Sequence, residues 1–286
     1  MMFFFEVLIG GLLAGMMYSL VALGFVLIFK ASGVFNFAQG AMVLFSALTF
    51  VSLLEKQWNI WICVVITLAA MVLLAFAIER VVLRPLVNQP PITLFMATIG
   101  LAFVIEGIAQ AMWGTQVHGL DVGIPDMPMK IKGMLISKFE IFTALIAGVL
   151  VAVLALFFSK TRIGRALRAV ADDHEAALTV GIPLRHIWVI VWAVAGVVWG
   201  TRMGVQFSLV LVAYKALPVL ILGGLDSVPG AIAGGLLIGA SEKLAEVYIG
   251  PFLGGAIEGW FPYMLALVFL LIRPEGLFGE VRIERV

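Results

Sequence analysis

The chain has 286 residues, of which 63% are hydrophobic and only 12% are charged, and its formal net charge at pH 7 is +1. This composition and a mean hydropathy of +1.15 exclude an ordinary soluble domain, and the near-neutral charge gives no indication of a nucleic-acid partner. Several apolar runs reach the ~20 residues that a helix needs to cross about 30 Å of hydrocarbon. A transmembrane barrel would instead show short segments of alternating hydrophobicity, which the sequence lacks. We therefore expect an all-α polytopic membrane protein.

Five spans are predicted in the first 158 residues. The amino-terminal run lacks the basic segment and cleavage site of a signal peptide, so it is expected to stay as the first span. A glycine-bounded break at 31–40 follows it, and prolines at 85–91 are expected to end the third helix. Gly114–Lys138 is expected to be an irregular loop of mixed charge. The five predicted spans are Phe4–Phe29, Ala41–Leu54, Trp58–Ile78, Ile92–Trp113 and Phe139–Phe158.

The last third of the chain is less regular. Leu184–Thr201 is predicted to span the membrane, and Phe207–Leu222 is apolar but interrupted by Lys215 and Pro218. Gly223–Gly230 is a strong break. Two further segments, Ala231–Ile249 and Gly255–Ile272, bring the total to eight or nine transmembrane helices, some of them broken or re-entrant.

Basic residues between the spans predict the orientation, because cytoplasmic loops carry the excess of Lys and Arg. The N-terminus is then outside and the loop Gly114–Lys138 is external. The basic residues on the predicted cytoplasmic side are Arg80, Arg84, Lys160, Arg162, Arg165, Arg168 and Arg185, and with nine crossings also Arg273, Arg282 and Arg285.

The only long polar run, Lys160–Pro183, has the pattern of a surface helix. Thr161 is a plausible N-cap and Gly181 a plausible stop. One face carries Ile163, Leu167, Val170, His174 and Leu178, and the opposite face carries Arg165, Arg168, Asp172, Glu175 and Thr179. One packed face and one free face favour a docking helix, and the alternative is a solvated loop helix that only solubilises this side of the protein.

The motifs of common catalytic and metal sites are missing from the sequence. It has no phosphate-binding G-x-x-x-x-G-K-[ST] motif and no H-E-x-x-H or G-x-S-x-G motif. The single cysteine, Cys63, excludes an intrachain disulfide. We therefore expect no enzyme, no metal site and no cofactor bound by this chain.

Ionisable residues within apolar runs have two interpretations, because they are costly in lipid. They form either a polar path for a substrate, or pairs between helices and side chains that reach the interface. Glu106 lies deep in the fourth span and is assigned to the path. Lys215 and Arg202 flank the seventh span, and Glu242, Lys243 and Glu246 are expected to be interfacial, near Tyr248.

The break after the first span is the stronger candidate for substrate contact. Its amides offer hydrogen bonds without net charge, and unwound backbone within a membrane survives only where protein or a water-filled cavity satisfies it. The alternative is a plain cytoplasmic turn. The residues assigned to the path here are Phe35, Asn36, Phe37, Gln39, Gly40 and Met42.

Five segments together resemble the permeases of branched-chain amino acid ATP-binding-cassette (ABC) importers, and in particular the first of their two paired permease subunits. The resemblance runs through nearly the whole chain, but the same family includes permeases for urea, short amides and aromatic acids. The segments are VFNFAQG at 34–40, ERVVLRP at 79–85, TRIGRALR at 161–168, LGGLDSVPG at 222–230 and RPEGL at 273–277.

The resemblance implies the ABC importer permease fold, a single permease domain over 1–286 and a bacterial inner-membrane location. It also implies that the polar helix, about 162–180, is a cytoplasmic coupling helix. Glu175-Ala176-Ala177 with Gly181 is similar to the loop signature of importer permeases, although the later Ile-x-Leu-Pro is absent. The residues implied to couple to the ATPase are Arg165, Arg168, Asp172, Asp173, His174, Glu175 and Gly181.

The implied partners are a second permease subunit, two cytoplasmic ATPase subunits that carry ATP and Mg²⁺, and a periplasmic or extracellular substrate-binding protein, with membrane lipid around the spans. Phe35, Phe37 and Met42 would suit an apolar substrate side chain, and no charge pair is evidently placed for a zwitterion. The competing classes are a stand-alone channel or secondary transporter, which would need no coupling helix, and an intramembrane enzyme.

Overall fold

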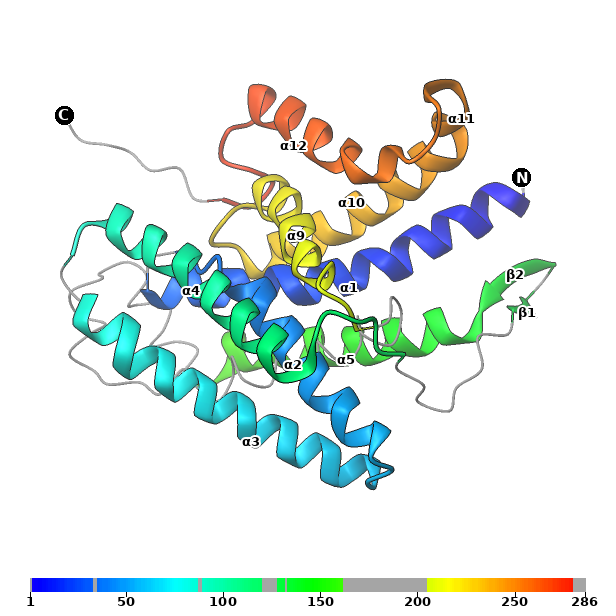
Figure 1. Cartoon of the computed structure of the whole chain (residues 1–286). Helices are drawn as coiled ribbons and strands as arrows, with labels where there is room; N and C mark the ends of the chain where they lie inside the picture. Colours follow the sequence, from blue (N-terminus) through cyan, green and yellow to red (C-terminus); the bar gives the residue numbers. More distant parts are fainter. Residues whose placement is uncertain are drawn as a thin grey trace, which may run out of the picture. The chain divides into compact units, whose positions relative to one another are not determined.

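The computed structural model describes residues 2–32, 35–86, 89–119, 128–131, 133–161 and 205–279. These residues are mostly helical (Figure 1). The helices are α1 (Met2–Ser32), α2 (Gln39–Glu55), α3 (Ile60–Ile78), α4 (Pro91–Trp113), α5 (Lys138–Lys160), α9 (Leu209–Gly223), α10 (Val228–Tyr248), α11 (Gly250–Leu253) and α12 (Phe261–Ile272).

Within these residues, four helices are long and apolar enough to cross a membrane, and the number rises to five if the bent pair α9–α10 counts as one span. The predicted spans that end at Phe29, Ile78, Trp113 and Phe158 correspond to α1, α3, α4 and α5. The predicted span Leu184–Thr201 lies outside the described residues. The chain is therefore a multi-pass helical membrane protein.

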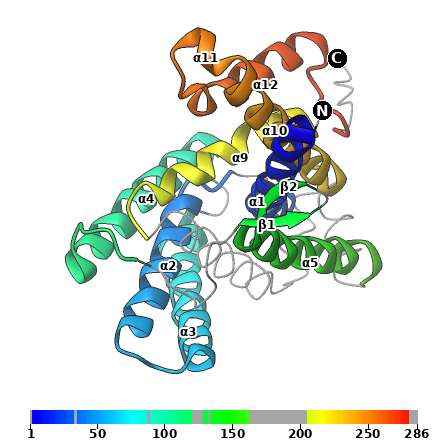
Figure 2. The ribbon, with the colours of Figure 1, turned by 90° about the vertical axis from the view of Figure 1, so that its right-hand side faces the viewer.

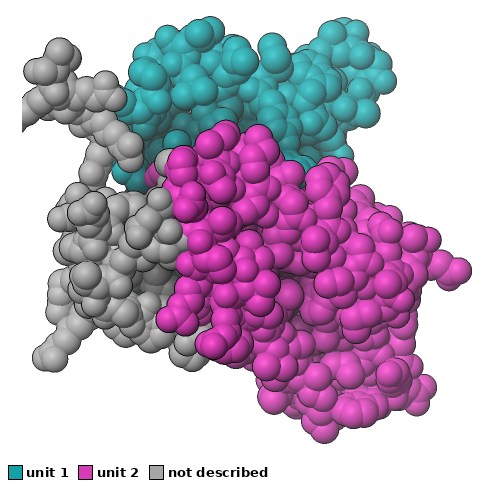
Figure 3. All heavy atoms as spheres, turned by 60° about the vertical axis from the view of Figure 1, so that its left-hand side comes forward, with its two compact units in different colours: residues 1–26, 123–157, 214–286 teal, residues 27–122, 158–213 magenta. Residues whose placement is uncertain are grey.

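The chain divides into two compact units, drawn in teal and magenta in Figure 3. The division falls within α1, within α5 and within α9. The first unit comprises residues 1–26, 123–157 and 214–286, and the second comprises 27–122 and 158–213.

In the second unit, α2 is the central helix. It packs on α3 and on α4 (Figure 2), and eleven of its 17 residues are buried. Its neighbour α3 is preceded by Asn59, whose side chain accepts the Trp61 N–H at 3.0 Å, the usual role of an N-cap. The sequence placed the end of this helix at Ile78, but it continues through a π-helical turn, Glu79–Leu83, and a short 3₁₀ turn, Arg84–Leu86.

In the first unit, α1 and α10 are in very close contact through glycines. A Cβ built on Gly15 would lie 2.5 Å from the carbonyl oxygen of Gly235, and one on Gly11 would lie 2.7 Å from that of Gly239. Ser19 adds a bridge, because its hydroxyl donates to the carbonyls of Gly15 at 2.9 Å and Ile232 at 3.2 Å. Small residues four apart let helix backbones approach in this way within membranes.

The predicted break at Gly223–Gly230 is confirmed as a sharp turn between α9 and α10, whose axes differ in direction by 114°. Ser227 caps α10 by accepting the Gly230 N–H at 3.0 Å. Lys215 and Pro218, which interrupt the apolar run before this turn, do not break the helix. Helix α9 is continuous through both, since one missing N–H can be tolerated in a helix that neighbouring helices support.

Two other predictions in the first unit were wrong. Gly114–Lys138 is not wholly irregular, because Pro128–Ile131 (β1) and Met134–Ser137 (β2) pair antiparallel, with Pro128 opposite Ser137. Gly133, with a φ of 88°, makes the tight turn between them. The last helix does not begin at Gly255, because Gly254, Gly255 and Ala256 all have positive φ and α12 starts only at Phe261.

Candidate functional site

The junction of α1 and α2, in the second unit, brings together the amides and aromatics predicted for the substrate path. The Asn36 carboxamide oxygen accepts the Ala38 N–H at 3.1 Å, which closes a side-chain turn. The Asn36 carbonyl accepts the Gln39 N–H at 3.3 Å. The amide nitrogen of Asn36 faces the Met42 sulfur at 3.9 Å. Asn36 therefore organises the four residues that lead into α2.

Aromatic rings fix the same junction against α4. The Phe35 ring lies 4.8 Å from that of Phe29 and 6.4 Å from that of Phe37, and Phe37 meets Phe95 edge-on at 4.9 Å. The Thr98 hydroxyl donates to the Phe35 carbonyl at 3.4 Å. The two phenylalanines assigned to the path are thus half-buried and held in an aromatic cluster.

The first turn of α2 is closely packed as well. A Cβ on Gly40 would lie 2.5 Å from the carbonyl oxygen of Val210, at the start of α9. Gln39 is fully buried. The junction therefore combines close backbone contact, buried amide groups and aromatic rings.

The structure does not bring Glu106 to this junction. Thr98, which touches Phe35, lies eight residues earlier on α4, so Glu106 is roughly 12 Å further along the helix axis. It is partly exposed within the second unit. Six of the seven residues assigned to the path therefore lie together, and the seventh stands apart. All residues assigned to ATPase coupling, from Arg165 to Gly181, lie outside the described residues.

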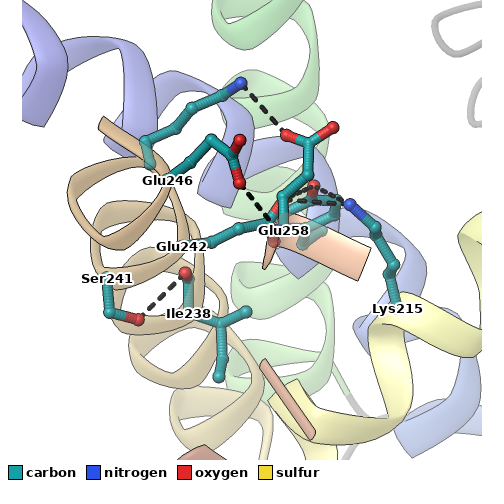
Figure 4. A network of polar contacts seen from close by, with 8 residues as sticks. Lys215, Ile238, Ser241, Glu242, Glu246 and Glu258 are labelled. Atoms are coloured by element: carbon teal, nitrogen blue, oxygen red, sulfur yellow. Dashed lines mark hydrogen bonds and ion pairs between the residues drawn. The ribbon is translucent and has the colours of Figure 1, made fainter. Parts of the chain in front are cut away.

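A second polar site, in the first unit, lies between the two limbs of the broken helix pair (Figure 4). Glu242 of α10 is only 2% exposed, yet the Lys215 ammonium group of α9 lies 2.9 Å from its Oε1. Tyr18 of α1 donates its hydroxyl to the same oxygen at 3.1 Å. The interpretation that Glu242 pairs between helices is confirmed by these contacts.

One turn further along α10, Glu246 binds the loop that precedes α12. The two carboxylate oxygens of Glu246 accept the N–H groups of Ala256 and Glu258, each at 2.9 Å. Lys243 lies 3.5 Å from the Glu258 carboxylate, and both side chains are partly exposed. This arrangement explains how Ala256 keeps a φ of 54°, which is unfavourable for a residue with a side chain.

Lys215 and Glu242 were each predicted as ionisable residues of apolar runs, but their pairing was not predicted. Their positions within apolar runs were the available signal. Among the described residues, no group of three His, Cys, Asp or Glu side chains could hold a metal ion.

Comparison with known proteins gives consistent matches over almost the whole chain. The model of a family described as branched-chain amino acid transport system / permease component matches residues 7–272. The high-affinity branched-chain amino acid transport system permease protein BraD of Pseudomonas aeruginosa is 26% identical over 99% of this chain and 98% of its own length.

Two further relatives carry similar names. The high-affinity permease protein LivH of Escherichia coli is 26% identical, with 100% of this chain and 98% of LivH aligned. The probable permease protein LivH of Methanocaldococcus jannaschii is 27% identical over 96% of this chain and 92% of its own. A solved structure, PsaBC from Streptococcus pneumoniae in complex with Fab, aligns at a TM-score of 0.49 and 14% identity, over 92% of this chain and 89% of that one.

Proposed function

The chain belongs to the family of permease components of branched-chain amino acid transport systems, and we propose that it carries a branched-chain or similar hydrophobic amino acid into the cytoplasm as a membrane subunit of an ABC importer. The observation that carries this proposal is the family match over residues 7–272. Urea, short amides and aromatic acids are the alternative substrates. A permease component moves its substrate and catalyses no reaction on it.

The partners in this proposal are a second permease subunit, identical or similar, two cytoplasmic ATPase subunits and an external binding protein. ATP and Mg²⁺ bind to the ATPases, and this chain supplies the path and the coupling helix at about 162–180. Transport follows alternating access: the loaded binding protein and ATP each favour one state of the permease, because a ligand shifts an equilibrium only by its differential affinity for the two states.

The α1–α2 junction is the part of the path that the described residues support best. Unwound backbone, an amide and half-buried aromatic rings occur there together, and Asn36 organises them. Such a site contacts an apolar side chain through the rings and a polar group through the amides. Glu106 contributes at another level of the path, along α4.

Asn36→Leu is expected to lower the rate of uptake about fivefold or more while the complex still assembles, because a buried N–H loses its acceptor. Uptake into proteoliposomes, with the yield of purified complex, measures both effects. Asn36→Asp keeps the acceptor for the Ala38 N–H but loses the donor toward Met42, so it separates the turn from the amide nitrogen. Normal uptake by Asn36→Leu would show that the α1–α2 junction is a plain turn and not part of the substrate path.

The proposed topology has eight or nine crossings in the inner membrane, with the N-terminus outside and the coupling helix inside. It places β1 outside and Gln89 inside. In a Cys63→Ser background, Lys130→Cys is expected to react with an impermeant maleimide in intact cells, and Gln89→Cys only after permeabilisation. Both positions are exposed, whereas Cys63 is buried. The reverse pattern of labelling would invert the topology.

Substrate-stimulated ATPase activity tests the function itself. The permease is co-expressed with its ATPases, placed in lipid and supplied with the binding protein loaded in turn with leucine, an aromatic acid and urea. Stimulation by leucine alone is the expected result. Stimulation by another ligand would change the substrate, and a permease that purifies without any ATPase would point to a stand-alone channel.

A further inference from the structure

Two opposite charges meet inside the first unit, where apolar residues dominate. Glu242 is 2% exposed, and the Lys215 side chain is 26% exposed. Ionisable groups within membrane-spanning segments are expensive, and they usually mark a path for ions or substrates. The pair joins α9, α10 and α1, because Tyr18 contacts both charged groups, at 3.1 Å from Glu242 Oε1 and 3.5 Å from Lys215 Nζ.

The hydrogen bonds of this pair are incomplete among the described residues. Tyr18 and Lys215 both use Glu242 Oε1, and the second carboxylate oxygen, Oε2, is buried and has no hydrogen-bond partner there. The Lys215 ammonium group has three N–H donors, and within the same residues it donates to the Glu242 and Tyr18 oxygens. The Glu242 carboxylate, whose Oε2 accepts no hydrogen bond from the described residues, therefore lies beside the Lys215 ammonium group.

A buried ion pair recovers its desolvation cost only when further hydrogen bonds satisfy the remaining donors and acceptors. A purely structural pair would be expected to complete those bonds within the protein. A ligand that brings both an ammonium group and a carboxylate would complete them here: its ammonium group would donate to Glu242 Oε2, and its carboxylate would accept from Lys215.

We propose that Lys215 and Glu242 bind the head group of a zwitterionic α-amino acid as it passes through the permease. This inference rests on the proposed function and narrows its substrate class. Urea and short amides carry no charge to match either group, and a simple carboxylic acid matches only Lys215. The sequence showed no charge pair evidently placed for a zwitterion, and the proposal assigns that role to Lys215 and Glu242.

The test measures binding to the intact complex of permeases and ATPases in lipid without the binding protein, by displacement of radiolabelled leucine. Leucine is compared with leucinamide, which lacks the carboxylate, and with 4-methylpentanoate, which lacks the ammonium group. Each analogue is expected to bind at least about tenfold more weakly than leucine, because one buried charge of the site stays unmatched.

Variants that remove one charge at a time show which residue binds the ammonium group of the ligand and which binds its carboxylate. Glu242→Gln is expected to weaken leucine about tenfold and leave 4-methylpentanoate unchanged, and Lys215→Gln is expected to weaken leucine and leave leucinamide unchanged. The matched control is Lys243→Gln, because Lys243 lies next to Glu242 on α10 and forms a more exposed ion pair, with Glu258. Leucine binding is expected to be unchanged in it.

If the ion pair only holds the helices together, the result is different. Its loss would then weaken the binding of all three ligands to the same extent, or prevent assembly. Equal losses, unchanged leucine affinity in both variants, or no leucine binding by the wild-type complex would each overturn the proposal. If the Glu242→Gln complex does not assemble, the test uses Lys215→Gln alone, because Lys215 is the more exposed residue of the pair. Leucine-stimulated ATPase activity of the wild type decides the proposed function separately.

Discussion

Gly239→Val is expected to abolish accumulation of folded permease, whereas Gly107→Val keeps it near the wild-type level. A Cβ at Gly239 would lie 2.5 Å from the Cα of Gly15 and closer still to the carbonyl oxygen of Gly11. These are backbone atoms of α1, which cannot move aside as a flexible side chain does. Overpacking of a well-packed core typically costs about 1–3 kcal/mol, and here two whole helices would have to separate.

The control is matched in chemistry, because both variants make the same substitution within an apolar helix. No atom lies within 4 Å of a Cβ built on Gly107 of α4, among the contacts that the structure describes. The yield of monodisperse protein in detergent and its thermal unfolding midpoint measure the effect. A stable, monodisperse Gly239→Val protein would show that α1 and α10 do not pack as closely as described.

The same contact shows how far sequence reasoning extends. Gly11 and Gly15 lie four residues apart in the first span, a spacing of small residues that allows helices to approach, and the structure has this close approach. Their partners, Gly235 and Gly239, are more than 200 residues away, and nothing in the local pattern of either helix selects the other. Small residues at a spacing of four indicate a contact face, but only the fold determines which helix covers it.

Local patterns predicted local structure well. The break at 31–40 and the turn at Gly223–Gly230 were both predicted from glycines, and the structure has both. The hairpin β1–β2 was missed because strands of four residues with one glycine between them give almost no periodic signal. The late start of α12 depends on Glu246, which holds the preceding loop from a different helix.

In the candidate sites too, contacts between residues close in sequence were predictable and contacts between distant residues were not. Phe35, Asn36, Phe37 and Met42 are neighbours in sequence, so their convergence could be predicted. Lys215 and Glu242 are 27 residues apart on two helices, and they meet only because the chain turns by 114° between them. Because each charge was considered separately, the sequence did not indicate that Lys215 and Glu242 form a pair.

The largest functional effect is expected from the triple replacement of Asp172, Asp173 and Glu175 by alanine. It should lower uptake and substrate-stimulated ATP hydrolysis about tenfold or more, while basal hydrolysis and assembly remain. Asp172 and Glu175 lie on the polar face of the predicted coupling helix, and Asp173 is next to them. Charged groups at an interface position the partners against each other, so without them the bound ATPases no longer transmit their movement to the permease, while ATP binding is unaffected.

The comparison that makes this result specific is Glu275→Ala, which removes an exposed acidic residue that the topology with nine crossings places on the same, cytoplasmic side. Uptake by this variant is expected to be close to wild type. If the triple variant also transports normally, the polar run 162–180 is a solvated loop helix and the ATPases dock elsewhere. If instead the complex falls apart, these acidic residues hold the subunits together as well as transmitting movement, and uptake would be lost together with the bound ATPase and its basal activity.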